Sequence, residues 1–90
     1  LYVVRCRGDT GGAERLELFE ALRADGIGVN VHYRPVHLQP LFRDLGFGPG
    51  DCPVGEAAYR DTITLPLYPG LPEAEQDRVI ESVRRFFSAR

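Results

Sequence analysis

The sequence predicts a two-layer α+β sandwich in which a small, mainly antiparallel sheet is covered by helices. Three short segments rich in β-branched residues are each followed by glycine or proline, as strands commonly are. Two longer segments repeat apolar residues at helical spacing. The expected order is strand, helix, strand, two helices, strand and helix, which suits two layers. The 90 residues make one domain, and a compact chain of this length has a radius of gyration of about 12 Å.

The first half of the chain predicts two strands around a helix. A strand is expected at residues 1–7, where an apolar run leads into a glycine-rich loop. A helix is expected over residues 13–24, and Gly26 can end it in a left-handed conformation. Residues 29–33 alternate between apolar and polar side chains, so they predict a second strand with one polar face. The predicted inward side chains of the helix are Leu16, Leu18, Phe19 and Leu22.

The middle of the chain predicts two short helices and a third strand. A helix over residues 38–45 is expected from apolar residues at i, i+3, i+4 and i+7, with Pro40 tolerated in its first turn. A loop follows, and then a helix over residues 53–61. Residues 63–65 predict the third strand, which a proline ends. The predicted inward side chains of the second short helix are Val54, Ala57 and Ala58.

The last helix has the clearest pattern in the chain. Pro72 opens it, acidic residues follow at its start, and arginines lie near its end, as the helix dipole favours. Its predicted apolar face consists of Val79, Ile80, Val83, Phe86 and Phe87. Because the helices are available for only one face of the sheet, the other face is expected to be apolar and covered by another domain.

Composition excludes several functions. A net charge of −2 without an evident basic patch argues against a nucleic-acid partner, and short apolar runs argue against a membrane partner. All 11 cationic residues are arginine, so the chain offers neither a P-loop lysine nor a Schiff-base lysine. The chain has no methionine and opens on a strand, so we expect it to be part of a larger protein. Cys6 and Cys52 are expected to be reduced thiols of a cytoplasmic protein.

The candidate site is the segment over residues 30–37, which holds both histidines of the chain. On the predicted strand, Asn30, His32 and Arg34 share one face. An arginine fork suits a diphosphate or carboxylate, histidines can donate to phosphate or sugar oxygens, and Tyr33 can stack or donate. The alternative is an edge strand with a solvated polar face, in which His37 caps the next helix. A metal site made from the two histidines is a weaker alternative, because no further ligands lie nearby.

Two blocks of the sequence resemble a known family. GIGVNVHYRPVHLQPL at residues 26–41 and LPLYPGL at residues 65–71 resemble the C-terminal end of the DegT/DnrJ/EryC1/StrS sugar aminotransferases, and the likeness runs from Tyr2 to about Phe87. These enzymes are fold-type-I transaminases that use pyridoxal phosphate and act on nucleotide-linked keto-sugars. The resemblance implies that residues 1–90 are the small C-terminal domain of such an enzyme, and that a large domain outside this chain holds the cofactor.

The resemblance also implies a reaction and a set of partners. The intact enzyme is expected to be a homodimer that moves an amino group, from L-glutamate as the expected donor, to a 4-keto nucleotide-linked sugar. This chain would close the substrate site without a catalytic, cofactor-binding or metal-binding residue of its own. The substrate-site candidates are Asn30, His32, Tyr33, Arg34 and His37. The competing hypothesis is a free-standing α+β ligand-binding or regulatory module without catalysis.

Overall fold

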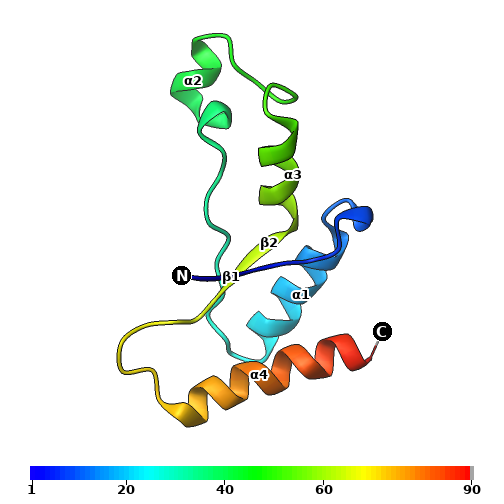
Figure 1. Cartoon of the computed structure of the whole chain (residues 1–90), viewed down its shortest axis with the longest axis vertical. Coiled ribbons are helices and arrows are strands. Elements are labelled where there is room, and N and C mark those ends of the chain that lie inside the picture. The colour runs from blue at the N-terminus through cyan, green and yellow to red at the C-terminus, as the bar shows by residue number, and fades with distance from the viewer. Residues whose placement is uncertain (90) are drawn as a thin grey trace.

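The computed structural model describes residues 1–89 and shows the predicted α+β class. Within this range, helices and 3-10 turns accompany a two-stranded antiparallel sheet (Figure 1). None of the described helices is long and apolar enough to cross a membrane. The elements in chain order are β1 (Tyr2–Arg5), the 3-10 turn η1 (Gly8–Thr10), α1 (Ala13–Ala24), the 3-10 turn η2 (Val36–Leu38), α2 (Pro40–Asp44), α3 (Pro53–Asp61), β2 (Thr62–Leu65) and α4 (Glu73–Ser88).

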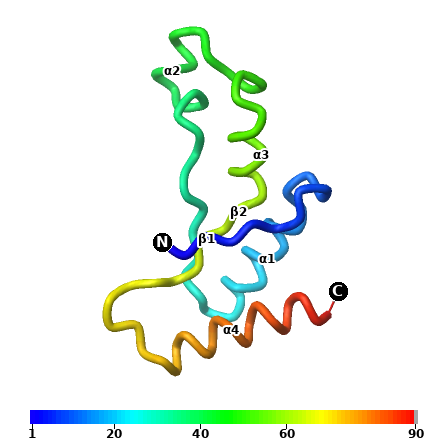
Figure 2. The backbone as a smooth tube through the Cα atoms, in the orientation of Figure 1, coloured from blue at the N-terminus to red at the C-terminus, as the bar shows by residue number. Residues whose placement is uncertain are grey.

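The molecule has two regions of different shape. We call residues 31–61 the arm, and residues 1–30 together with 62–89 the body. In the arm the chain runs outwards from the sheet, forms α2 at the far end and returns through α3, as Figures 1 and 2 both show. The radius of gyration is 15.2 Å and the molecule measures 47 × 32 × 19 Å. The projecting arm therefore makes the chain less compact than the 12 Å expected of a globular domain of this length.

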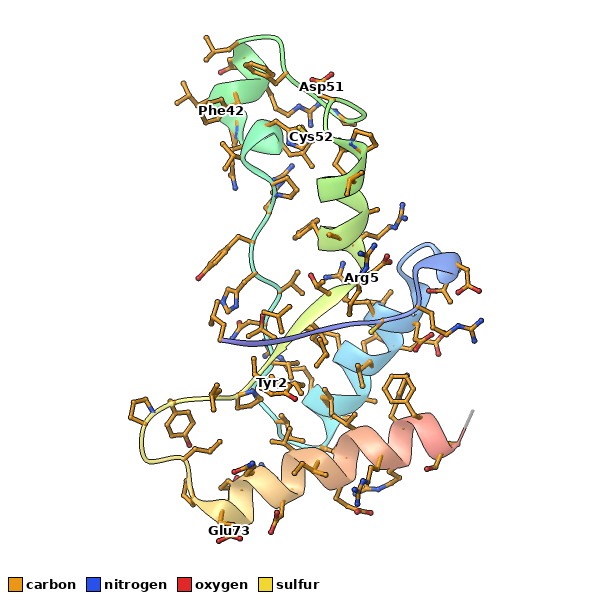
Figure 3. The ribbon with its side chains drawn as sticks, viewed as in Figure 1. Tyr2, Arg5, Phe42, Asp51, Cys52 and Glu73 are labelled. Carbon is orange, nitrogen blue, oxygen red and sulfur yellow. The ribbon has the colours of Figure 1, made fainter. Side chains whose placement is uncertain are left out.

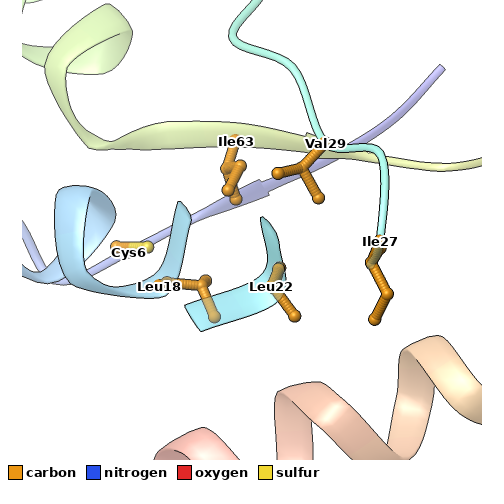
Figure 4. Close-up of a cluster of buried hydrophobic side chains, with 6 residues drawn as sticks. All are labelled: Cys6, Leu18, Leu22, Ile27, Val29 and Ile63. Carbon is orange, nitrogen blue, oxygen red and sulfur yellow. The ribbon is translucent and has the colours of Figure 1, made fainter. Parts of the chain in front are cut away.

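The hydrophobic core lies between the sheet and α1, with α4 packed outside (Figure 4). Val79, Val83 and Phe86 of α4 pack against this cluster, as its periodicity predicts. The other two residues of the predicted apolar face, Ile80 and Phe87, are exposed. The core side chains that are almost wholly buried are Cys6, Leu18, Leu22, Ile27, Val29 and Ile63. The helices pack in this way because each has one apolar stripe, which is buried on the same side of the sheet.

Polar contacts tie the end of α1 to α4. Asp25 follows α1, and its carboxylate accepts a hydrogen bond from the buried Ser82 hydroxyl and lies 3.4 Å from Nη1 of Arg85. Arg78 of α4 donates to the Asp25 carbonyl oxygen at 3.2 Å. Gly26 then turns with a φ of 79°, a conformation that favours glycine. These contacts explain how a serine is buried on α4 without losing its hydrogen bond.

The predicted second strand at 29–33 is wrong as a full strand. It appears as one antiparallel bridge, in which Asn30 N donates to Thr64 O at 3.2 Å and Thr64 N donates to Asn30 O at 2.7 Å. Val29 beside it is fully buried, so the predicted alternation of inward apolar and outward polar side chains does hold at the start of the segment. Pairing ends there because the chain leaves the sheet to form the arm, and Pro35 lacks an N–H to continue a ladder.

Three other details of packing differ from the sequence prediction. Leu16 is 55% exposed, because α1 turns Leu18 and Leu22 towards the sheet instead. Val54 is 80% exposed, because α3 belongs to the arm and only its later residues approach the body. Helix α2 begins at Pro40 and not at residue 38, since the residue before a proline favours an extended conformation. Helices α1, α3 and α4 otherwise keep their predicted positions.

The sheet face turned away from the helices is polar, which contradicts the expected apolar face. In the register, Val3 faces Thr64 and Arg5 faces Thr62, and these four residues share that side. We call it the open face. The apolar residues of the same strands, such as Tyr2 and Val4, point the other way and line a groove of about 320 Å³ against α4. Tyr2 and Arg5 leave β1 on opposite sides in Figure 3.

Candidate functional site

The structure brings Asn30 and His32 together at Thr64, with the Tyr33 ring beside His32, and places His37 apart from them. Asn30 pairs with Thr64 through its backbone, and the Nδ1 atom of His32 lies 3.0 Å from the Thr64 hydroxyl. Both therefore adjoin Thr64, which belongs to the open face. His37 lies further along the arm, in η2, where it contacts a different element.

His32 is held in one orientation by the sheet. Its Nδ1 bonds to Thr64, which is itself 5% exposed and central in β2. Among the described residues its Nε2 atom has no hydrogen-bond partner, so this atom can serve a ligand. A ring fixed by one nitrogen presents the other in a defined direction, which suits recognition of a phosphate or sugar oxygen.

Tyr33 and Arg34 project from the start of the arm. Tyr33 is 71% exposed, and its ring centroid lies 4.5 Å from that of His32. Arg34 is also exposed, and its carbonyl oxygen accepts a hydrogen bond from the Gln39 side chain at 3.4 Å. The exposed ring and guanidinium are therefore accessible to a bound molecule beside His32.

His37 is held by a carboxylate that the sequence analysis missed. Its Nε2 atom lies 2.9 Å from the carboxylate of Glu56, a residue in the first turn of α3. Glu56 also accepts hydrogen bonds from the backbone N–H groups of Gly50, at 2.9 Å, and Cys52, at 3.0 Å. We call this group the latch. Its signal in the sequence is an acidic residue in the first turn of a helix, the usual place for such a cap.

The latch stabilises the ionised form of Glu56. The Gly50 N–H, then the His37 ring and then the Cys52 N–H lower the pKa of Glu56 below its ordinary value of 4.5, because each donates a hydrogen bond to the carboxylate. Because His37 lies in η2 and Glu56 lies in α3, their contact joins the outgoing and returning halves of the arm. The alternative in which His37 caps the next helix is wrong, because α2 has no side-chain cap.

The open face holds further polar groups that the sequence analysis did not single out. Arg5 lies on it beside Thr62, and its guanidinium approaches the buried carboxylate of Asp61. Strand alternation in residues 1–7 was the available signal, because it places Arg5 opposite the apolar side chains of Tyr2 and Val4. No pattern in the sequence predicts that Asp61, at the junction of α3 and β2, is buried.

The chain does not have the residues needed to hold pyridoxal phosphate covalently. That cofactor requires a lysine amine, and no position of the sequence is lysine. Within the described residues, no three His, Cys, Asp or Glu side chains gather closely enough to hold a metal ion. Among the described residues neither the buried Cys6 nor the exposed Cys52 forms a disulfide.

Comparison with known proteins identifies the family. The sequence model of the DegT/DnrJ/EryC1/StrS aminotransferase family matches residues 1–84. The chain belongs to this family. The matched region includes the arm and all of the body up to residue 84 in α4, so family membership rests on nearly the whole chain.

Several curated members of this aminotransferase family are similar in sequence. The dTDP-3-amino-3,4,6-trideoxy-alpha-D-glucose transaminase of Micromonospora megalomicea is 42% identical over 87 residues, which cover 93% of this chain and 21% of that protein. The spore coat polysaccharide biosynthesis protein SpsC of Bacillus subtilis is 37% identical over 86 residues, which cover 93% of this chain and 22% of SpsC. The erythromycin biosynthesis sensory transduction protein EryC1 of Saccharopolyspora erythraea is 35% identical over 85 residues, which cover 93% of this chain and 22% of EryC1. The chain thus spans about a fifth of the length of these relatives.

Proposed function

We propose that this chain is the small C-terminal domain of a pyridoxal-phosphate-dependent transaminase that acts on a nucleotide-linked sugar. The observation that carries the proposal is the 42% identity, over 93% of the chain, with a protein named as a dTDP-amino-sugar transaminase. The reaction moves an amino group from L-glutamate to the C4 keto group of the sugar, and leaves 2-oxoglutarate. The lack of lysine supports a division in which another domain holds the cofactor.

When bound in that other domain, pyridoxal phosphate supplies the electron sink for amino-group transfer. The residues of this chain bind and orient the substrate. His32, fixed by Thr64, presents Nε2 to an oxygen of the nucleotide-sugar, and the adjacent Tyr33 and Arg34 offer further donors. Binding energy from the nucleotide portion then positions the sugar carbon that reacts.

Asn30 and His37 have more limited roles in this proposal. Asn30 places the segment on Thr64 through its backbone and turns its exposed side chain to the open face. His37 has Nε2 occupied by Glu56, so contact with substrate would use its Nδ1 atom. Its main contribution is to hold the arm in a shape that borders the site.

The proposal extends to the sugar substrate, the oligomeric state and the cellular location of the enzyme. We propose a UDP-linked 4-keto-6-deoxy-N-acetyl-altrosamine type of substrate, as in pseudaminic acid biosynthesis, and a homodimeric enzyme in the cytoplasm. This choice rests on the resemblance of the HYRPVH and LPLYPGL blocks. One relative is named for a different amino sugar, dTDP-3-amino-3,4,6-trideoxy-alpha-D-glucose, so a panel of substrates is needed to choose among them.

The proposal is tested with the intact protein that contains this chain. Purified protein is incubated with pyridoxal phosphate, L-glutamate and either a UDP-linked or a dTDP-linked 4-keto-6-deoxy sugar. The expected result is equal amounts of 2-oxoglutarate and amino sugar, measured by mass spectrometry, with the UDP-linked substrate preferred. The 90-residue chain alone is expected to be inactive. Tight binding of the sugar nucleotide without any amino sugar formed would instead support the ligand-binding or regulatory module.

A further inference from the structure

Arg5 lies on the open face of the sheet, among donors that could meet a ligand. It pairs with Thr62 in the register, and Thr64 lies two residues further along the same face of β2. Same-face neighbours on a strand are about 7 Å apart. His32 is bonded to Thr64, so Arg5 and His32 flank a short row of hydroxyl groups. The face therefore carries a cation at one end and an imidazole at the other.

The buried Asp61 carboxylate lies beneath Arg5. Its side chain is 1% exposed, and its Oδ2 atom lies 3.5 Å from Nη2 of Arg5. Its Oδ1 atom lies 3.8 Å from Nε of Arg60 and has no hydrogen-bond partner among the described residues. One carboxylate is thus shared by two guanidinium groups, so the group of three side chains carries a net positive charge.

The geometry differs from that of an ion pair whose sole role is to stabilise the fold. Stabilising arginine–carboxylate pairs are commonly bidentate and shorter than 3 Å, and buried charges need such contacts to offset their desolvation. Here Arg5 makes a single contact at 3.5 Å, and its side chain remains 55% exposed. Most of its N–H donors are therefore directed away from Asp61 and remain accessible on the open face.

We propose that Arg5 is an anion-binding residue of the open face, and that the buried Asp61 carboxylate positions it. The ligand group is a carboxylate or a phosphate, because the planar fork of arginine matches both. The source of the anion rests on the proposed function: it is either the carboxylate of the amino donor or the diphosphate of the sugar nucleotide. His32 adds a second donor to the same bound molecule.

A first experiment tests the site without relying on activity. The intact protein is treated with phenylglyoxal, which modifies arginines, in the presence of sodium pyrophosphate, sodium L-glutamate or sodium chloride at equal ionic strength. Modification of individual arginines is measured by mass spectrometry. Either pyrophosphate or glutamate should protect Arg5, while Arg7, which lies just beyond β1 and pairs with Asp9, should react equally in all conditions. Equal reactivity of Arg5 in all three solutions, or equal protection of Arg7, overturns the proposal.

A second experiment separates binding from folding. Arg5→Gln leaves Asp61 poorly compensated, so its effect alone could reflect a damaged fold. The double variant Arg5→Gln with Asp61→Asn removes both charges and keeps similar shapes. We expect it to unfold close to the wild-type temperature and still to raise the KM of one co-substrate about tenfold, as loss of a charged hydrogen bond does.

The identity of the affected co-substrate distinguishes the two sources of the anion. A higher KM for L-glutamate indicates the carboxylate, and a higher KM for the keto-sugar indicates the diphosphate. Arg7→Gln is the matched control and should change neither. A wild-type KM in the double variant overturns the proposal. If the wild-type protein forms no amino sugar at all, the proposed function fails, and protection of Arg5 from phenylglyoxal still decides whether the anion site exists.

Discussion

The body and the arm are held together by different forces. In the body, side chains such as Leu22, Val29 and Ile63 are fully buried between helices and sheet, so removal of apolar surface from water supplies most of the stability. In the arm no residue before Asp61 is buried, and the large apolar residues Leu41, Leu45 and Val54 are each exposed by at least 66%. The contacts that the arm makes instead include the hydrogen bonds of the latch and the edge-to-face packing of Phe42 and Phe47.

This difference shows how the candidate site is organised. His32 lies where the arm leaves the body, and its partner Thr64 belongs to the sheet. The rigid body can therefore fix the ring, while Tyr33 and Arg34 extend from it along a segment with few buried contacts. Binding residues placed at the edge of a stable scaffold are a common arrangement in proteins. Five experiments can test whether the two regions behave as differently as their contacts suggest.

The largest effect is expected in the body. Leu22→Ala removes a fully buried side chain and should lower the free energy of unfolding by about 2–5 kcal/mol. Leu16→Ala on the same helix is the matched control, because Leu16 is 55% exposed, and its cost should be well under half as large. Urea denaturation followed by circular dichroism measures both. Equal costs would mean that α1 does not pack as described.

The second-largest effect is expected at His32, which lies where the arm leaves the body. In the intact enzyme, His32→Ala should raise the KM for the keto-sugar nucleotide about tenfold, since a ligand hydrogen bond contributes roughly 1–3 kcal/mol when a charge is involved. The half-reaction with the amino donor, measured alone at saturation, should be unchanged. Loss of that half-reaction would place His32 at the catalytic centre, and an unchanged sugar KM would indicate a solvated edge.

His37 offers the matched comparison for His32. If it acts through the latch, Glu56→Ala should raise the sugar KM at least as much as His37→Ala, because it breaks the same hydrogen bond and also removes the acceptor of the Gly50 and Cys52 N–H groups. A larger effect of His37→Ala would indicate that its ring also contacts the substrate. Steady-state kinetics of the two variants, prepared in the same intact enzyme, decide between these outcomes.

A smaller, local effect is expected from the latch. Glu56→Ala removes the acceptor of the Gly50 and Cys52 N–H groups, so both amides should exchange faster with deuterium. Amides of α1 and β2 should keep their protection, because the core is untouched. Glu20→Ala, an exposed position on α1, serves as the control. Faster exchange throughout the body would show that the arm and the body unfold as one unit.

The smallest effect is expected from pH, because a protonated carboxyl keeps one acceptor oxygen. The folded state lowers the pKa of Glu56, so the latch contributes stability above the ordinary value of 4.5 and loses it as pH falls through the lowered pKa. Protection of the Gly50 amide, corrected for intrinsic exchange rates, should therefore decline only below pH 4.5. In Glu56→Gln the decline should be absent. A decline near neutral pH would contradict the assignment to Glu56.

The accuracy of the sequence prediction follows the same division between body and arm. Helix α4 was predictable because Pro72, the charge asymmetry and the apolar spacing all indicate the same element. Helix α3 was predictable in its bounds, from a proline at its start, but not in its packing, since Val54 is exposed. Side-chain direction in a short helix depends on which neighbour the rest of the chain supplies.

The sequence by itself determined the class of fold, the positions of α1, α3 and α4, and the family, because these depend on local spacing and on contiguous motifs. Only the tertiary structure decided that residues 29–33 make a single bridge, that the open face is polar, and that Glu56 holds His37. It also decided that Asp61 is buried between Arg5 and Arg60. These features join residues far apart in the chain, and no local periodicity records which distant groups meet when an arm leaves a sheet and returns.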